Sequence, residues 1–183
     1  MLDCCLELPS WCRIFLSQVE HFESDEDKMM LAVELSKQNV LLGTGGPFGA
    51  AVFDGTGRVV SVGVNVVESS GCSVAHAEMM ALMLGQRVLG RYRLNGVDGD
   101  GEYVLATSAQ PCSMCFGALP WAGIDRLLCG ATREDVEDIA GFDEGPLPVD
   151  WQGELAKCGI SVATGLLREQ AVAVLKEYRG EVY

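Results

Sequence analysis

Two short motifs, His76-Ala77-Glu78 and Pro111-Cys112-Ser113-Met114-Cys115, constrain this chain more than any other feature. One histidine and two cysteines at this spacing offer three ligands to one zinc ion and leave the fourth tetrahedral position open for water. Such an open position is typical of catalytic zinc sites, whereas structural sites use four protein ligands. We therefore predict Zn²⁺ bound by His76, Cys112 and Cys115.

Other interpretations of these residues were weighed. A Cys-x-x-Cys pair on its own also occurs in redox sites, in half of a zinc knuckle, or as two core cysteines. The only other histidine is His21, so a second histidine ligand is scarcely available. Cys72 lies four residues before His76 and raises the question of a substitute ligand. We favour His76 as the ligand and interpret Cys72 as a loop thiol.

Length and composition predict one compact domain. The chain has 183 residues, of which 49% are hydrophobic, and it has no apolar run of 18 residues that could span a membrane. Residues 2–22 include acids and Pro9 and lack the basic start of a signal peptide. Without a secretion signal, the eight cysteines indicate reduced thiols and a cytoplasmic location.

The charge balance restricts the partners. The chain has 13 basic and 26 acidic residues, which gives a net charge of −13, and the basic residues form no cluster. Proteins that bind polynucleotides use basic surfaces, because contacts to phosphates supply much of the affinity. We therefore expect no nucleic acid or membrane partner, and a small uncharged substrate.

Hydrophobic periodicity divides the chain into a helical extension, residues 1–24, and a domain, residues 25–183. Ser24 and Asp27 mark the start of a long helix that ends at Gly43. Five strands are expected. Two further helices are expected to begin at His76 and at Pro111, and two more are expected later in the chain. The strands are 48–53, 58–65, 102–107, 126–131 and 159–164; the later helices are 133–139 and 167–178; residues 141–153 read as a loop.

The connections between these elements predict an α/β fold. Gly55-Thr56-Gly57 between the first two strands is typical of a hairpin turn. The connection between the fourth and fifth strands is long and holds a helix, which suits a parallel crossover. We expect a three-layer α/β/α sandwich with a mixed five-stranded sheet.

With these motifs in place, the chain resembles the cytidine/deoxycytidylate deaminase superfamily, from the first long helix to the C-terminus. His-x-Glu followed by Pro-Cys-x-x-Cys is the signature of its zinc nucleobase deaminases. Further segments resemble the bacterial guanine deaminase branch: Gly45-Gly46-Pro47-Phe48-Gly49-Ala50, Val64-Asn65, Phe116-Gly117-Ala118, Trp121-Ala122 and Gly141-Phe142-Asp143-Glu144. The resemblance implies a cytidine deaminase-like fold.

It also implies the reaction, which is hydrolysis of guanine to xanthine and ammonia. Some relatives accept ammeline, a triazine shaped like guanine, which is therefore a second candidate substrate. Glu78 would take a proton from the zinc-bound water and deliver it to a ring nitrogen. Proton transfer to the leaving amine favours a second carboxylate, which by resemblance is Glu144. Without the resemblance, Glu144 would read as one more acid in an acidic loop.

Further residues are assigned by the same resemblance. Asn65 matches an amide that hydrogen-bonds the base, Phe48 and Trp121 match residues that wall the ring, and the Ala77 backbone is a candidate substrate contact. Otherwise Asn65 would be a strand-end turn residue, and the two aromatics would be ordinary core residues. The family often has Glu before Pro-Cys, whereas this chain has Gln110.

Relatives close the site with a C-terminal tail in a domain-swapped homodimer, through a tyrosine near the chain end. Tyr183 is the expected residue here, ahead of Tyr178.

Three alternative functions stay open. A tRNA adenosine deaminase shares Pro-Cys-Ser-Met-Cys, although the acidic net charge and the loop with Glu144 count against it. A cytidine deaminase fits less well, because the hairpin of that enzyme does not suit the long connection between the fourth and fifth strands. A non-catalytic zinc-stabilised binding module is the weaker alternative, because it has no use for Glu78.

Overall fold

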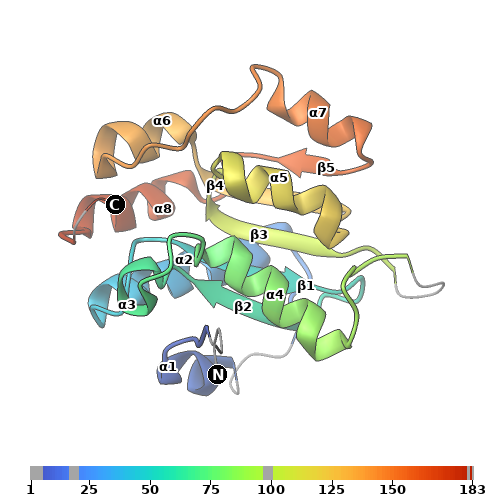
Figure 1. The fold of residues 1–183 in the computed structure, drawn as a ribbon, viewed down its shortest axis with the longest axis horizontal. Coiled ribbons are helices and arrows are strands. Elements are labelled where there is room, and N and C mark those ends of the chain that lie inside the picture. The colour runs from blue at the N-terminus through green and yellow to red at the C-terminus, as the bar shows by residue number, and fades with distance from the viewer. Residues whose placement is uncertain (1–5, 17–20, 97–100, 181, 183) are drawn as a thin grey trace.

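The fold is built on one mixed sheet with the strand order β2-β1-β3-β4-β5 (Figure 1). A computed structural model describes the chain except residues 1–5, 17–20, 97–100, 181 and 183. β1 pairs antiparallel with β2 and β3, and β3, β4 and β5 run parallel, which confirms the predicted crossover. The strands are β1 (Gly49–Phe53), β2 (Val59–Val64), β3 (Val104–Ala109), β4 (Arg126–Ala131) and β5 (Ser161–Ala163).

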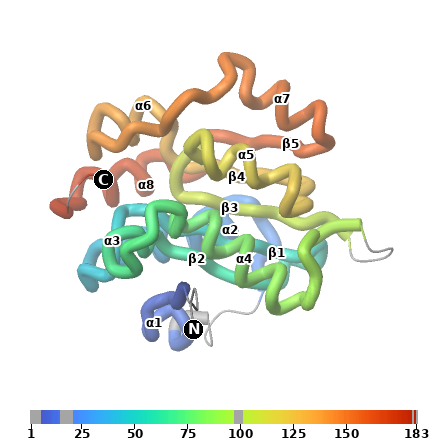
Figure 2. Tube along the Cα trace, in the orientation of Figure 1, coloured from blue at the N-terminus to red at the C-terminus, as the bar shows by residue number. Residues whose placement is uncertain are grey.

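Helices cover both faces of the sheet, so the predicted three-layer sandwich is confirmed. On one face α2 (Asp25–Leu41) and α8 (Arg168–Glu177) bury apolar side chains against the strands. The other face carries α4 (Ala77–Leu89), α5 (Ser113–Ala122) and α7 (Trp151–Lys157). Figures 1 and 2 show α4 and α5 beside each other over the strands. β1 is covered on both faces, and all five of its residues are buried.

The expected start of the long helix is confirmed. Ser24 is the N-cap of α2, and its side chain accepts a hydrogen bond from the Asp27 backbone N–H. Acidic residues fill the first turn, where their negative charge interacts favourably with the positive end of the helix dipole.

The structure corrects several element boundaries. α5 begins at Ser113 with Cys112 as its N-cap, two residues later than expected from Pro111. A short helix, α3 (Val67–Ser70), follows β2, and α7 lies partly inside the segment expected to be a loop. Buried Leu155 and the cap by Asp150, which accepts from the Gly153 N–H, explain α7. The predicted helix 133–139 is α6 (Arg133–Asp135), followed by a π-helical turn, η1 (Val136–Ala140).

The extension contains α1 (Ser10–Leu16) and packs on the domain. Cys12 is buried in the same core as α2, and the Trp11 Nε1–H donates to Thr44 Oγ1 at 3.2 Å. The boundary at residue 24 remains a prediction. None of the helices in the described part of the chain combines the length and apolar character needed to cross a membrane. The six cysteines of that part are free thiols.

Gly63 allows α4 to approach β2 closely enough to place the His76 motif. A Cβ atom at Gly63 would lie 2.0 Å from the Ala77 carbonyl oxygen and 2.5 Å from the Ala81 nitrogen. Both neighbours are backbone atoms of α4, so neither can turn aside. The strand and helix can therefore pack at this distance only with glycine here.

We expect Gly63→Ala to destabilise the protein by about 1–3 kcal/mol, the usual cost of overpacking, and to weaken metal binding as α4 shifts. The control is Gly117→Ala in α5, where a Cβ meets no atom within 4 Å. Alanine there should be neutral or stabilising by up to about 1 kcal/mol. Denaturant unfolding and metal titration measure both effects; equal stability of the two variants would contradict the packing argument.

Candidate active site

The candidate metal centre lies where α4 and α5 begin. His76 is the N-cap residue of α4, Cys112 is the N-cap of α5, and Cys115 lies in the first turn of α5. The His76 Nδ1 atom is 3.5 Å from the Cys112 Sγ and 3.7 Å from the Cys115 Sγ. Ordinary Zn–N and Zn–S bonds in a tetrahedron separate N from S by about 3.6 Å. The three residues therefore fit one zinc ion.

The two thiols are electrostatically coupled. The hydrogen bond with Cys115 is the main cause that lowers the pKa of Cys112 to about 4, and His76 adds to it. The same hydrogen bond, followed by burial, raises the pKa of Cys115. One thiolate thus forms easily and the second does not, because the pair shares a proton. A divalent cation in place of that proton stabilises both thiolates, so metal binding releases a proton.

Glu78 and Cys72 both lie outside this ligand group. In the described residues, the candidate metal cluster consists of His76, Cys112 and Cys115 alone. Glu78 is the second residue of α4 and is 6% exposed. Burial, then the charge of Cys112, raises its pKa above the ordinary carboxyl value. Glu78 is therefore placed to hold a proton next to the metal centre without binding the metal.

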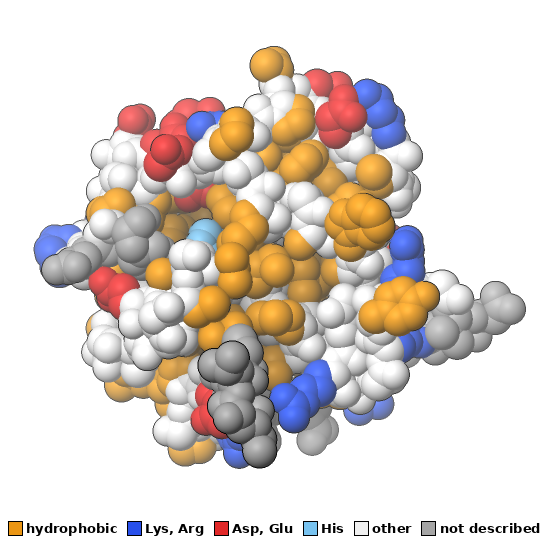
Figure 3. All heavy atoms as spheres, viewed as in Figure 1, with side chains coloured by type: hydrophobic (Ala, Val, Ile, Leu, Met, Phe, Trp, Pro, Cys, Tyr) orange, Lys and Arg blue, Asp and Glu red, His pale blue; other side chains and the backbone are white. Residues whose placement is uncertain are grey.

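A cavity of about 190 Å³ opens beside the metal centre. This volume is below the 300–1,000 Å³ typical of sites for drug-sized ligands, so it suits a single small ring system. The space-filling view in Figure 3 shows a histidine side chain in a hollow next to acidic and hydrophobic side chains. The lining residues are Phe48, Asn65, Val67, Ser73, His76, Glu78, Gln110, Cys112, Phe142, Asp143 and Glu144.

Glu144 reaches the cavity from the loop that follows η1. The Ser113 backbone N–H donates to the Glu144 carbonyl oxygen at 2.9 Å, which ties this loop to the first turn of α5. Glu144 is 7% exposed. Burial raises the pKa of its carboxyl to about 8, and the charges of Cys112 and Glu78 act in the same direction. A carboxyl with a pKa in this range can exchange a proton near neutral pH.

Asn65 presents a hydrogen-bond donor without a partner to the cavity. Its Oδ1 accepts from the Val67 backbone N–H at 3.2 Å, so the amide is oriented with Nδ2 on the other side. The Nδ2 atom is buried and has no partner. Asn39 Nδ2 donates to the carbonyl oxygens of Gly46 (2.9 Å) and Asn65 (2.8 Å), which fixes the backbone around it. An unpaired buried donor is costly, so a ligand acceptor is expected there.

The fold does not bring every predicted residue to this cavity. Trp121 is 82% exposed near the end of α5, nine residues after Cys112 and therefore about 13 Å along the helix. Trp121 does not line this cavity in the single chain, so its role as a wall of the substrate ring stays a prediction. Ala77 is fully buried and its side chain does not line the cavity. Tyr183 lies outside the described residues, and Tyr178 packs on Phe142 with ring centroids 5.8 Å apart.

Several lining residues were not predicted as site residues, namely Val67, Ser73, Gln110, Phe142 and Asp143. Gln110 directly precedes Pro111-Cys112, and Phe142 lies within Gly141-Phe142-Asp143-Glu144, so their closeness in sequence to Cys112 and Glu144 could have indicated a place in the site. Val67 and Ser73 give no such signal, because only the turn after β2 brings them to the cavity.

The amino-acid sequence matches a known family. The model of the "Cytidine and deoxycytidylate deaminase zinc-binding region" matches residues 22–131. The guanine deaminase of Bacillus subtilis is 38% identical over 113 residues, which cover 62% of this chain and 67% of that protein. A tRNA-specific adenosine deaminase of Haemophilus influenzae is 34% identical over 110 residues, 60% of each chain.

Solved structures extend the similarity to nearly the whole chain. A guanine deaminase from Nitrosomonas europaea has a TM-score of 0.89 and 42% identity, and the match covers 96% of both chains. An asparagine-to-alanine mutant of the protein NE0047 in complex with 8-azaguanine has a TM-score of 0.90 and 42% identity, covering 96% of this chain and 97% of that one. Family model, relatives and site geometry agree, and this chain belongs to the cytidine and deoxycytidylate deaminase family.

Proposed function

We propose that this chain hydrolyses guanine to xanthine and ammonia at the cavity beside His76, Cys112 and Cys115. The observation that carries the proposal is the unpaired, buried Nδ2 donor of Asn65 in a cavity that also holds two carboxyls with raised pKa, Glu78 and Glu144. Donor and carboxyls face one small space, which suits a neutral heterocycle with both donors and acceptors.

The hydrogen-bonding groups of guanine match this lining. Its acceptors, O6 and N7, suit the Nδ2 donor of Asn65. Its donors, N1–H and the 2-amino group, suit a carboxylate such as Glu144. Adenine has the opposite pattern at positions 1 and 6, so it would leave buried polar groups unpaired. Mismatches of this kind reject an analogue by about 10⁴-fold or more.

The roles of the protein groups follow from their positions. Zinc, when bound, supplies a Lewis acid that activates water at neutral pH. Glu78, buried beside the ligands, would hold the proton that the attacking water gives up and pass it to a ring nitrogen. Glu144, with its pKa near 8, delivers a proton to the departing amine. Phe48 and Phe142 contact each other edge to face, with ring centroids 5.2 Å apart, and border the ring on one side.

The named relatives support a purine base as substrate. NE0047 was solved with 2,6-diaminopurine, and variants of it that replace one asparagine or one glutamate were solved with 8-azaguanine. The similarity to tRNA-specific adenosine deaminases is the basis of the alternative function. The net charge of −13 favours the uncharged base over a polynucleotide. Ammeline stays a second candidate substrate.

The homodimer and the cytoplasmic location also remain proposals. Hydrophobic side chains gather on the face with α4 and α5 (Figure 3), and Met83, Val88 and Trp121 are exposed among the described residues. A partner chain on this face would cover them. In the single chain, Val182 lies 3.7 Å from the Cβ position of Gly141, at the start of the Glu144 loop. The tail is thus close enough to influence the site.

The metal assignment predicts one zinc per chain. Cys112→Ser and His76→Ala should each lose zinc, because they remove one of three protein ligands, whereas Cys72→Ser should keep it. Elemental analysis of the purified proteins measures the content. Zinc retained by Cys112→Ser, or lost from Cys72→Ser, would contradict the ligand set.

The substrate assignment predicts ammonia release from guanine, with xanthine as the other product. We expect activity on guanine and none on adenine, cytosine, cytidine or a tRNA anticodon hairpin. The same assay tests ammeline as a second substrate. The assay needs zinc-loaded protein with its metal content measured first. Deamination of the hairpin with no reaction of guanine or ammeline would establish the alternative function instead.

The roles proposed for the two carboxyls predict how their variants behave. Glu78→Gln should keep zinc and the fold while turnover falls by at least about 10²-fold, the usual scale of general acid–base catalysis. Glu144→Gln should also lose turnover without losing zinc, because it lies outside the ligand cluster. The control is Glu154→Gln on the exposed face of α7. Near-normal turnover of zinc-loaded Glu78→Gln would contradict the role of Glu78 as the proton carrier.

A further inference from the structure

The loop that carries Glu144 begins at an uncommon turn. α6 continues directly into the π-helical turn η1, which closes with a hydrogen bond from the Gly141 N–H to the Val136 carbonyl oxygen at 3.1 Å. A π-helical turn holds one more residue per hydrogen bond than an α-helical turn and is often found at functional sites. Conversion to an α-helical turn would shift the register of the residues that follow, so the position of Glu144 depends on η1.

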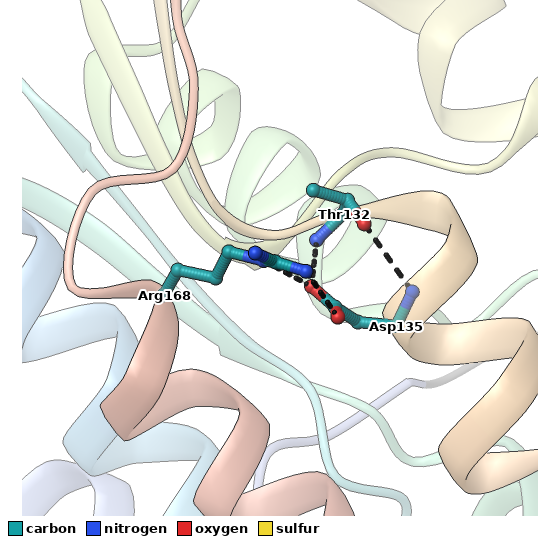
Figure 4. A network of polar contacts seen from close by, with 3 residues as sticks. All are labelled: Thr132, Asp135 and Arg168. Atoms are coloured by element: carbon teal, nitrogen blue, oxygen red, sulfur yellow. Dashed lines mark hydrogen bonds and ion pairs between the residues drawn. The ribbon is translucent and has the colours of Figure 1, made fainter.

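An ion pair secures the N-terminal end of this segment (Figure 4). The Arg168 guanidinium donates two hydrogen bonds of 2.7 Å to the Asp135 carboxylate. The same carboxylate accepts from the Thr132 backbone N–H at 2.9 Å, and the Thr132 hydroxyl accepts from the Asp135 N–H at 3.3 Å. The bonds from Arg168 lower the pKa of Asp135 to about 2. Asp135 thus stays ionised. Its carboxylate takes part in the capping box of α6 and at the same time binds Arg168 of α8.

The C-terminal end of α8 supports the residues that follow η1. Tyr178, the C-cap residue of α8, packs on Phe142, and Phe142 packs on Phe48 in the cavity wall. One helix of ten residues, about 15 Å long, therefore contacts the segment both before and after η1. Since α8 also buries Val174 and Leu175 against the sheet core, it is a rigid support.

From these contacts we infer that Arg168 is a positioning residue for catalysis, which acts through Asp135 and η1 to hold Glu144 at the substrate. The inference rests on the proposed function, because it assumes that Glu144 handles a proton of the reaction. Arg168 does not line the cavity beside the metal centre and is not one of the predicted metal ligands, so we assign it no direct contact with the substrate. Displacement of a catalytic group by 1 Å from a distant change can cost about 10²-fold in rate.

Arg168 is the better residue to replace, because its side chain is 53% exposed and Asp135 keeps its bonds to Thr132 without it. We expect Arg168→Ala to lower kcat on guanine by about 10- to 100-fold with zinc content retained and KM changed little. Arg168→Lys keeps the charge but not the two-bond geometry, so it should recover part of kcat. The matched control is Lys157→Ala, which breaks an exposed ion pair to Glu154 in α7 and should leave kcat unchanged.

A double-mutant cycle separates positioning from a general loss of structure. Glu144→Asp keeps a carboxylate in a shorter side chain and should retain measurable turnover. If Arg168 acts through Glu144, Arg168→Ala should cost much less in the Glu144→Asp background than in the wild type. An equal loss of kcat in both backgrounds would overturn the inference, and so would wild-type kcat for Arg168→Ala.

Amide hydrogen exchange provides a measurement that does not depend on the substrate. Arg168→Ala should speed exchange at residues 141–145 in the zinc-loaded protein, while the amides of β3 and β4 stay protected. Unchanged exchange at 141–145 would overturn the inference. A wild-type protein inactive on guanine, with faster exchange in the variant, would instead contradict the proposed function and leave the support of this loop by Arg168 established.

Discussion

The approach of two helix starts, α4 and α5, is the constraint on which the rest of the site depends. It brings His76 Nδ1 within 3.7 Å of both sulfurs. The sheet sets this approach, because both helices pack on the same face of it. Gly63 lets α4 lie directly on β2, and small residues fill β1 between the layers. Because three ligands meet at backbone-fixed positions, the metal would find its site largely preorganised.

Burial gives the same region its acid–base properties. Glu78 and Glu144 are both nearly inaccessible to water, and each carboxyl is kept from ionising freely by its surroundings and by the nearby thiolate charge. Bound zinc would oppose this effect through its positive charge. The site therefore combines buried groups that are costly on their own, including the unpaired Asn65 amide. A metal and a substrate, as proposed, would relieve these costs together and so couple binding to the chemistry.

Support for the site extends beyond its lining. Ser113 fixes the Glu144 carbonyl, Asn39 fixes the backbone of Asn65, and α8 supports the segment that leads to Glu144 through Asp135 and Phe142. Ser113, Asn39 and Asp135 lie outside the cavity lining, whereas Phe142 is part of it. Each holds a loop whose own residues cannot keep one conformation, since loops have few backbone partners of their own.

The sequence by itself determined the sandwich fold and the cluster of His76, Cys112 and Cys115, and it predicted zinc as the bound metal and a proton-carrying role for Glu78. These depend on local spacing, on caps such as Ser24 and on hydrophobic periodicity, which are properties of neighbouring residues. Tertiary structure alone decided that Trp121 lies on the surface, that Val67 and Ser73 reach the cavity, and that α7 and η1 form in a segment rich in glycine and acids. It also paired Arg168 with Asp135, 33 residues apart. Such features arise from contacts between distant segments, and the packing of helices on the sheet fixes which segments meet.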